Sequence, residues 1–420
     1  MSFPHYPAYK ASGVEWLGEV PENWSVIALK HGYVVTLGKM LQPEAASEGD
    51  ILLPYLRAAN IRWSGVENSD IKTMWFSMRD REHLRLQVGD LLVSEGGDVG
   101  RSALWNGEID ECYFQNSVNR VRPSNGNLTS FLRYWMSTMK DKGFIDVLCN
   151  KSTIAHFTAE KVGAVPVPLP AVDEQHAIAT FLDRETAKID ALIAEQQRLI
   201  ELLQVKRQAV ISHAVTKGLN PNAPMKDSGV EWLGDVPEHW DVVQFKKFVD
   251  IQNGSDHKQV EQVEGYPVFG SGGVFAYASE FLYDGESVLL GRKGTIDKPL
   301  HITGRFWTVD TMYWTRISLD VCGRFTFYSA LNIPFDFYST NTALPSMTKG
   351  ALSSHRVTYP PLAEQTQIAS FLDRKTAKID ALKGEQQRLI ELLQERRSAL
   401  ISAAVTGQID VRGLTEEVAA

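Results

Sequence analysis

The chain has 420 residues, of which 44% are apolar and 22% are charged, a composition typical of globular proteins. A single hydrophobic core does not keep growing at this length, so we expect two or more domains. Met1–Lys10 shows no basic stretch followed by an apolar one, and no apolar run approaches the roughly 20 residues that span a bilayer, so we expect a cytoplasmic protein without a membrane partner. Cys112, Cys149 and Cys322 lack metal-ligand spacing, which predicts reduced thiols and no metal site.

The net charge of −8 is unusual for a protein that binds nucleic acid. Residues 27–167 contain 16 Lys+Arg and 16 Asp+Glu, and residues 243–359 contain 11 of each kind, so the acidic excess lies outside these two regions. Neutral regions can present local basic faces, but they lack strong sequence-independent attraction to phosphates. If the chain binds nucleic acid, partner proteins should supply much of the affinity.

The first recognisable segment, Ser12–Val26, recurs as Ser228–Val242 with 12 of 15 residues identical. A near-identical segment used twice in one chain indicates one structural task performed twice. Its tryptophans are expected to anchor each copy against its own domain or helix, with a role in a partner interface left open: Trp16, Trp24, Trp232 and Trp240.

The variable region after the first copy is expected to mix strands and helices. Asp50–Leu56, Asp90–Ser94 and Asn119–Arg122 are strand-like, and Thr129–Met139 is helix-like. Glycine allows close backbone approach, Arg can pair with guanine, and Gln or Asn can pair with adenine. The candidate DNA contacts are therefore Ser94, Gly96, Gly97, Arg101, Gln115, Asn116 and Arg120. Taken singly, each could instead be a turn residue or a solvated charge.

A longer repeat follows, in which Glu174–Thr216 recurs as Glu364–Thr406 with 32 of 43 residues identical. Apolar residues at heptad spacing predict a helix over Thr186–Thr216, about 46 Å long, and an equal helix in the second copy. Gly218 and Gly407 are expected to end the two helices. The predicted coiled-coil seam and partner-docking positions are Leu182, Ile189, Leu192, Gln196, Leu199 and Leu203, matched by Leu372, Ile379, Leu382, Gln386, Leu389 and Leu393. Two ordinary amphipathic helices on separate cores are the alternative, but the matching lengths and matching glutamines favour pairing.

Lys217–Asp227 contains two prolines and is expected to be a linker. The second variable region has strand-like segments at Tyr266–Phe269, Ser287–Leu290 and Met312–Ile317. Its glycine-rich turns supply the candidate DNA contacts Ser271, Gly272, Arg292, Lys293 and Thr295. Asn332–Phe335 superficially resembles an adenine methyltransferase motif, but it has Ile333 where that motif has proline, so we attribute the similarity to chance.

The predicted organisation alternates shared segments with variable ones. In order, it comprises a first frame segment (1–26), a first variable domain (27–167), a helical region (168–217), a linker (218–227), a second frame segment (228–242), a second variable domain (243–359), a second helical region (360–407) and a tail (408–420), in which Arg412–Ala420 is expected to be frayed.

The segments around the variable domains are similar to a known family. Pro168–Leu182 and Pro360–Leu372 resemble the conserved regions of the specificity subunits of type I restriction–modification systems. Gly89–Arg101 resembles one class of that family's target-recognition domains, and Gly270–Gly273 and Gly291–Gly294 resemble another. The resemblance covers nearly the whole chain from Ser12 to Gly407.

The resemblance implies an α+β fold with two target-recognition domains, each reading half of an interrupted double-stranded DNA site. It implies a pseudo-twofold arrangement in which two long antiparallel coiled-coil helices separate the domains and dock two modification (methyltransferase) subunits. S-adenosylmethionine is expected on those subunits, and ATP and Mg on restriction (endonuclease) subunits. The chain itself is expected to hold no cofactor and to have no catalytic residue.

Two other functions stay open at this point. The chain could be a protein–protein scaffold without DNA contact, which salt-dependent DNA binding by the assembled complex would exclude. It could also be a self-contained methyltransferase or nuclease, although no Ser/His/Asp constellation, histidine cluster or Gly-rich cofactor loop supports that.

Overall fold

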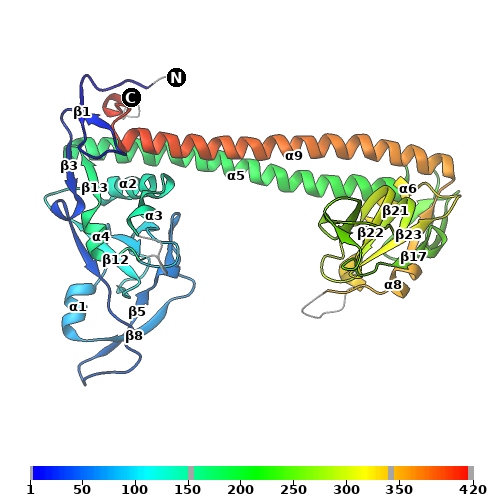
Figure 1. Cartoon of the computed structure of the whole chain (residues 1–420), viewed down its shortest axis with the longest axis horizontal. Helices are drawn as coiled ribbons and strands as arrows, with labels where there is room; N and C mark the ends of the chain where they lie inside the picture. Colours follow the sequence, from blue (N-terminus) through cyan, green and yellow to red (C-terminus); the bar gives the residue numbers. More distant parts are fainter. Residues whose placement is uncertain (1–2, 150–155, 339–344, 415–420) are drawn as a thin grey trace. The chain divides into compact units, whose positions relative to one another are not determined.

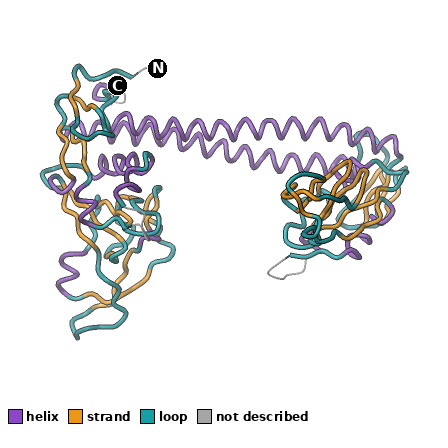
Figure 2. The backbone as a smooth tube through the Cα atoms, in the orientation of Figure 1, coloured by secondary structure: helices purple, strands orange, loops and turns teal. Residues whose placement is uncertain are grey.

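A computed structural model describes residues 3–149, 156–338 and 345–414. The chain divides into two compact units, which we describe separately: Met1–Glu195 with Leu389–Ala420 forms unit 1, and Gln196–Arg388 forms unit 2 (Figure 1). Both units combine helices and strands, so the predicted α+β class is confirmed (Figure 2). Two long helices, α5 (Val172–Lys217) and α9 (Leu362–Val405), contribute to both units.

Unit 1 contains short strands and helices before α5. They are β1 (Tyr9–Ala11), β2 (Glu19–Pro21), β3 (Ser25–Ala28), β4 (Tyr33–Leu37), β5 (Ile51–Leu56), β6 (Ile61–Arg62), β7 (Gly65–Val66), β8 (Lys72–Phe76), α1 (Met78–Leu84), β9 (Leu91–Ser94), β10 (Ser102–Leu104), β11 (Tyr113–Phe114), β12 (Val118–Pro123), α2 (Thr129–Asp141), α3 (Phe144–Leu148), α4 (Ala159–Ala164) and β13 (Pro166–Leu169).

Unit 2 contains a second set between the two long helices. They are β14 (Met225–Asp227), β15 (Asp235–Pro237), β16 (Asp241–Gln244), β17 (Val249–Asn253), β18 (Glu261–Gln262), β19 (Tyr266–Gly270), β20 (Gly273–Ala278), β21 (Tyr283–Gly291), β22 (Leu300–Thr308), β23 (Met312–Ile317), α6 (Gly323–Ala330), α7 (Phe335–Tyr338), α8 (Lys349–Ser354) and β24 (Arg356–Tyr359).

The two variable domains are built on different sheets. Within the described residues, the first domain has a four-stranded sheet ordered β10-β9-β12-β4 and a three-stranded sheet ordered β11-β5-β8. The second has a seven-stranded sheet ordered β17-β23-β21-β22-β19-β20-β18. Buried apolar residues lie in the middle of both, at Leu91–Val93 of β9 and at Val288–Leu290 of β21, because Val and Leu are among the residues most often fully buried. The domains therefore differ in topology as well as in sequence.

Each variable domain begins and ends on a pair of antiparallel strands. β3 pairs with β13, placing Ile27 opposite Val167, and β16 pairs with β24, placing Val243 opposite Val357. The ends of each domain therefore lie side by side next to the start of a long helix. This pairing is the same in both halves, although the intervening sheets are not.

The sequence predicted the strands and the helix of the variable domains correctly, but not the start of the first long helix. The helix predicted over Thr129–Met139 is α2, and the predicted strands each coincide with an observed strand. The predicted start of the first long helix at Thr186 is wrong, because α5 begins at Val172 and has 46 residues, about 69 Å. The additional turns are helical because Ile178 and Leu182 on them pack into the core of unit 1.

Glycines end both long helices, as expected. Gly218 and Gly407 have φ angles of +77° and +73°, a left-handed conformation that glycine adopts without strain. Gly407 also lies close to the frame, since a Cβ there would come within 2.3 Å of the Pro21 ring. Glycine at position 407 therefore allows the chain to turn at the end of α9, where any larger residue would clash with Pro21.

The segment after α9 is folded, and the prediction of a frayed Arg412–Ala420 is wrong for Arg412–Leu414, which form a short 3-10 helix, while residues 415–420 lie outside the described residues. Ile409 and Val411 are buried in the core of unit 1. The backbone N–H of Asp410 donates to the carbonyl of Pro4 at 2.8 Å. The first and last described segments of the chain therefore lie side by side in unit 1 (Figure 1).

Replacing Gly407 should test this closure. We expect Gly407→Ala to lower the free energy of unfolding by about 1–3 kcal/mol, because the new Cβ is strained at positive φ and meets Pro21. Gly384→Ala, inside α9 with no atom closer than 3.8 Å to the added Cβ, should instead raise stability by about 0.5–1 kcal/mol. Urea denaturation of both variants measures the difference, and equal effects would contradict the assignment.

Candidate nucleic-acid interface

In unit 1, Ser117 joins several of the predicted DNA-contact segments. Its carbonyl accepts from the N–H of Glu95 at 2.9 Å, and its hydroxyl accepts from the N–H of Ala58 at 3.1 Å. Arg101 reaches the same loop, because its guanidinium donates to the carbonyl of Ala58 at 2.8 Å. The loops after β5, β9 and β11 therefore form one surface region.

Five of the seven predicted residues in unit 1 reach this surface to some degree. Gly97 is exposed, and Gly96, Arg101, Gln115 and Asn116 are partly exposed. The backbone N–H of Asn116 donates to the carbonyl of Lys39 at 2.9 Å, which holds the β11–β12 turn against the loop after β4. The side chains of Gln115 and Asn116 form no side-chain hydrogen bond recorded within the described part of the chain, so they are available to base edges.

Ser94 and Arg120 are buried, which argues against the predicted direct contacts with DNA. Arg120 lies on β12 between two neighbouring strands and is 6% exposed. Its guanidinium donates to the carbonyl of His83 at 2.9 Å and to the hydroxyl of Thr36 at 3.1 Å. Burial lowers the pKa of Arg120. Arg120 therefore holds the sheet and the end of α1 together.

In unit 2, one turn joins the two glycine-rich segments. The N–H of Val309 donates to the carbonyl of Phe269, just before the Ser271–Gly272 hairpin turn. The N–H of Arg292 donates to the carbonyl of Thr311 at 2.9 Å. The turn between β22 and β23 is therefore in contact with both predicted contact segments.

The predicted residues of unit 2 differ in how available they are. Lys293 and Gly272 are exposed, and Ser271, Arg292 and Thr295 are partly exposed. Arg292 donates to the carbonyl of Asp310 and lies over the ring of Tyr313. Lys293 forms no ion pair recorded among the residues that the structure describes, so its ammonium is available to a phosphate.

The variable domains attach to the long helices through residues that the repeat shares. Gln175 accepts from the N–H of Leu128 at the start of α2, and Gln365 accepts from the N–H of Cys322 at the start of α6, both at 2.9 Å. Further along, Asp183 accepts from the Tyr134 hydroxyl at 2.6 Å. Asp373 does the same for Tyr328 at 2.7 Å, and Arg324 beside it helps hold the pKa of this carboxyl below its usual value.

Sequence reasoning missed these attachment residues. Their only signal was their identity in both copies of the long repeat, at Gln175/Gln365 and Asp183/Asp373. The same two side chains orient unlike domains because each domain presents a helix at the same place.

One ion pair joins the two long helices in each unit, and the two pairs together show that the helices run antiparallel. In unit 1, Arg397 donates to both carboxylate oxygens of Asp190 at 2.8 and 3.2 Å. In unit 2, Arg207 lies 3.2 Å from Asp380. Asp190 and Asp380 are equivalent positions of the two copies of the repeat, as are Arg207 and Arg397. The aspartate comes from α5 in one pair and from α9 in the other, as a pseudo-twofold relation between the helices requires.

One row of the predicted seam is wrong. The first row is buried at Leu182, Ile189, Leu372, Ile379 and Leu393, and is half-buried at Gln196, Leu203 and Gln386. The second row is exposed instead: Leu192 by 44%, Leu199 by 40%, Leu382 by 45% and Leu389 by 40%. The isoleucines one residue later are less exposed, since Ile390 is buried and Ile193 and Ile200 are half-buried. Adjacent residues lie about 100° apart on a helix, so a one-residue shift moves the seam to another face.

The exposed leucines form equivalent sets in the two units. Unit 1 exposes Leu192 of α5 with Leu389 and Leu392 of α9, and unit 2 exposes Leu382 of α9 with Leu199 and Leu202 of α5. Both sets represent the same three positions of the repeat. Large apolar side chains exposed at the same positions of both copies suggest a contact that is used twice.

The described residues contain no group of His, Cys, Asp and Glu that could hold a metal ion. No described helix is both long and apolar enough to cross a bilayer.

Two unlike recognition domains on a twice-used helical frame define a bipartite recognition protein. Residues 21–202 and 237–392 match the family model for the type I restriction modification DNA specificity domain. The chain therefore belongs to this family, and its role is DNA sequence specificity.

Known proteins with the same plan match over most of their length. The putative type I restriction enzyme MjaX specificity subunit of Methanocaldococcus jannaschii is 22% identical, over 94% of this chain and 96% of the relative. The EcoKI specificity subunit of Escherichia coli is 21% identical, over 95% and 92%.

Solved structures share the fold. A chain from a structure concerned with complex assembly and conformational transition of the type I R-M system superposes with a TM-score of 0.72. It is 14% identical, and the match covers 92% of this chain and 98% of that one. The HsdS subunit from Thermoanaerobacter tengcongensis gives a TM-score of 0.54 at 15% identity, covering 93% and 98%.

Two substitutions should separate structural from DNA-contacting cations. Arg120→Met should lower the free energy of unfolding by about 2 kcal/mol or more, because buried carbonyl and hydroxyl partners lose a charged donor. Lys293→Ala should change stability by less than about 0.5 kcal/mol, yet weaken DNA binding of the assembled complex and reduce its salt slope by about 1. Chemical denaturation and salt-dependent DNA titration measure the two effects. A stable Arg120→Met variant with altered sequence preference would reverse the assignment.

Proposed function

We propose that each target-recognition domain reads one half of a bipartite, interrupted DNA site, and that the chain performs no catalysis itself. The observation that carries the proposal is that the frame segments and long helices are nearly the same in both halves, whereas the variable domains are different. The strand pairs, attachment residues and helix contacts repeat almost unchanged, whereas the first domain has a four-stranded and a three-stranded sheet and the second has one seven-stranded sheet. A protein that used both domains for one task would not need two different readers.

The surface loops of each domain provide the chemistry for base reading. Gln115 and Asn116 in unit 1 can donate and accept at the edge of adenine, and Arg292 in unit 2 can donate to guanine. Lys293 and the glycine turns can approach phosphates, which position the reader without specifying sequence. Because the two sets differ, the DNA site should be asymmetric.

The electroneutral domains make the assembled complex necessary for tight binding. Regions 27–167 and 243–359 carry no net charge, so counterion release from this chain alone should be small. We expect modification subunits to supply much of the phosphate contact and to hold S-adenosylmethionine. Restriction subunits, where present, would use ATP and Mg.

The exposed leucines are the proposed docking positions for two modification subunits. The three positions recur in unit 1 and in unit 2, so each unit offers the same apolar contact. Burying a leucine side chain contributes about 1.5–3 kcal/mol, and three such side chains can anchor a helix of a partner. The stoichiometry of two per chain follows from the repeat.

Sequencing the methylated bases of a host with and without this gene tests the function. We expect methylation at a two-part, asymmetric motif that disappears when the gene is deleted and returns when it is restored. Exchanging only residues 243–359 for another second domain should change one half of the motif and leave the other half intact. An unchanged methylome after deletion would reject a DNA-specificity role in that host.

The docking positions can be tested separately in each unit. Replacing Leu192, Leu389 and Leu392 with Asp should remove one modification subunit from the complex, because charged residues cannot be buried in an apolar contact. The equivalent triple replacement at Leu382, Leu199 and Leu202 should remove the other. Native mass spectrometry of the co-expressed complex counts the subunits.

Gln197→Asp, at an exposed polar position of α5, is the matched control and should retain both subunits. Retention of two subunits by both triple variants would exclude these positions as the docking surface.

A further inference from the structure

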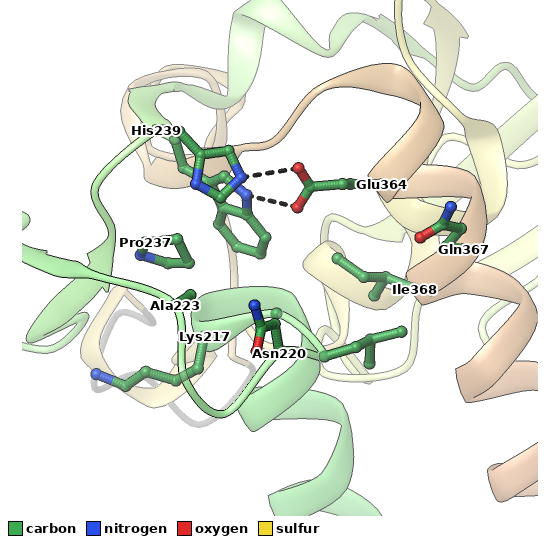
Figure 3. A pocket seen from close by; sticks show the side chains of 11 residues that line it. Lys217, Asn220, Ala223, Pro237, His239, Glu364, Gln367 and Ile368 are labelled. Atoms are coloured by element: carbon green, nitrogen blue, oxygen red, sulfur yellow. Dashed lines mark hydrogen bonds and ion pairs between the residues drawn. The ribbon is translucent and has the colours of Figure 1, made fainter.

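Unit 2 contains a pocket of about 390 Å³ between the linker after α5 and the first turns of α9. Figure 3 shows His239 and Glu364 on one side of it, with Pro237, Ala223 and Ile368 around the cavity. The Glu364 carboxylate accepts from His239 Nε2 at 2.7 Å and from Trp240 Nε1 at 3.0 Å. The pocket therefore has a carboxylate and an aromatic wall, and none of the candidate DNA contacts lines it.

The first half of the chain contains an equivalent site, which we call a cradle: a tryptophan that donates to a glutamate, with a tyrosine side chain bound between them. Glu174 accepts from Trp24 Nε1 at 2.9 Å and from Asn23 Nδ2 at 3.1 Å, and it also accepts from the Tyr6 hydroxyl at 2.6 Å. The Tyr6 ring meets the Trp24 ring edge-on, with centroids 5.8 Å apart, and Tyr6 is only 5% exposed. The phenol closes the cradle.

The two cradles correspond residue by residue. β1 places Tyr9 opposite Pro21, and β14 places Met225 opposite Pro237. Each residue of the first pair is separated from its counterpart in the second by the same number of residues (the same offset) as Trp24 is from Trp240. The glycine after each long helix lies against the cradle, since a Cβ on Gly218 would come within 3.1 Å of the Trp240 ring. By this offset, the counterpart of Tyr6 is Asn222.

Asn222 is exposed and does not fill the pocket. Glu364 is accordingly half-buried, whereas Glu174 is buried. A carboxylate offers about four acceptor positions. Only two donors to Glu364 are recorded in the part of the chain that the structure describes, so the carboxylate can accept a third.

We propose that this pocket, the Trp240 pocket, binds a tyrosine side chain from an extended segment of a partner protein. The phenol would donate to Glu364 and lie edge-on against Trp240, as Tyr6 does with Glu174 and Trp24. In unit 2 the linker takes the path that Phe3–Tyr9 takes in unit 1, since Met225 pairs with Pro237, so only the tyrosine and a short extended stretch around it would enter the pocket from the solvent side. The inference rests on the repeated frame and does not depend on the proposed DNA function.

The probe is a fluorescent peptide copying residues 3–11 of this chain, titrated into the full-length protein by anisotropy and calorimetry. We expect one saturable site. A peptide carrying Tyr6→Phe should bind about tenfold more weakly, because it loses the hydrogen bond to a carboxylate. Asn222→Tyr in the protein should abolish binding by filling the pocket from within, while the matched control Asn222→Ser should leave it unchanged.

The first half supplies an internal standard for the probe. Tyr6→Ala in the protein should open the equivalent cradle in unit 1 and raise the stoichiometry to two. One site in Tyr6→Ala and none in the wild type would overturn the proposal, as would no binding to either protein. Binding that persists in Asn222→Tyr would place the peptide elsewhere and also overturn it.

A second copy of this chain could present its own Tyr6, and sedimentation velocity distinguishes this source. Concentration-dependent dimerisation that Asn222→Tyr removes would overturn the assignment to a different protein. A monomeric wild type that binds the peptide at one site supports it.

Discussion

The hydrogen bond from a buried tryptophan to a glutamate at the start of a long helix holds each half of this protein together. Trp24 and Trp240 are fully buried, and they donate to Glu174 and Glu364 across 150 and 124 residues of sequence. Glu174 is buried, and a carboxylate removed from water is costly unless it is hydrogen-bonded, so its contact strongly favours one arrangement of the frame in unit 1. The end of the other long helix packs against the same tryptophan, at Gly407 in unit 1 and at Gly218 in unit 2. We call this junction of a frame segment, the start of one long helix and the end of the other a corner.

Each corner therefore uses both copies of the repeat. In unit 1 a frame segment and α5 from the first copy meet the end of α9 from the second, and in unit 2 the contributions are exchanged. Neither half can complete its corner from its own sequence. This interdependence explains why the ends of the chain are folded together and why the linker forms strand β14 instead of remaining irregular.

The frame constrains the variable domains only at their edges. A domain must begin and end on neighbouring antiparallel strands and must present a helix start to Gln175 or Gln365. It must also place a tyrosine hydroxyl beside Asp183 or Asp373. Nothing in these requirements fixes the sheet between them. Domains with different sheets can therefore be attached to the two copies of the frame in the same way. This is the structural basis for a DNA site with two unlike halves.

The repeat made the frame predictable from sequence, because identity between distant segments is independent of local propensity. The seam was only half predictable. Leu192 and Ile193 are adjacent and both apolar, as are Leu199 and Ile200, so heptad spacing alone cannot tell which row faces the partner helix. The buried guanidinium of Arg120 was not predictable either, since its partners His83 and Thr36 come from other parts of the chain. The folded tail depended on contacts with the opposite end of the sequence, at Pro4 and Tyr6.

The absence of net charge in the two readers has a consequence for specificity. A reader with many phosphate contacts would bind most DNA tightly, and its specific contacts would add to a large non-specific background. In this chain the candidate base-reading groups lie on neutral domains, and partner subunits are proposed to supply the non-specific affinity. Each good contact to a base is worth about 1–3 kcal/mol, so a few correct contacts in each half can decide which sites the complex retains. Two half-sites read together multiply their discrimination, and the frame makes that possible by carrying both readers on one pair of helices.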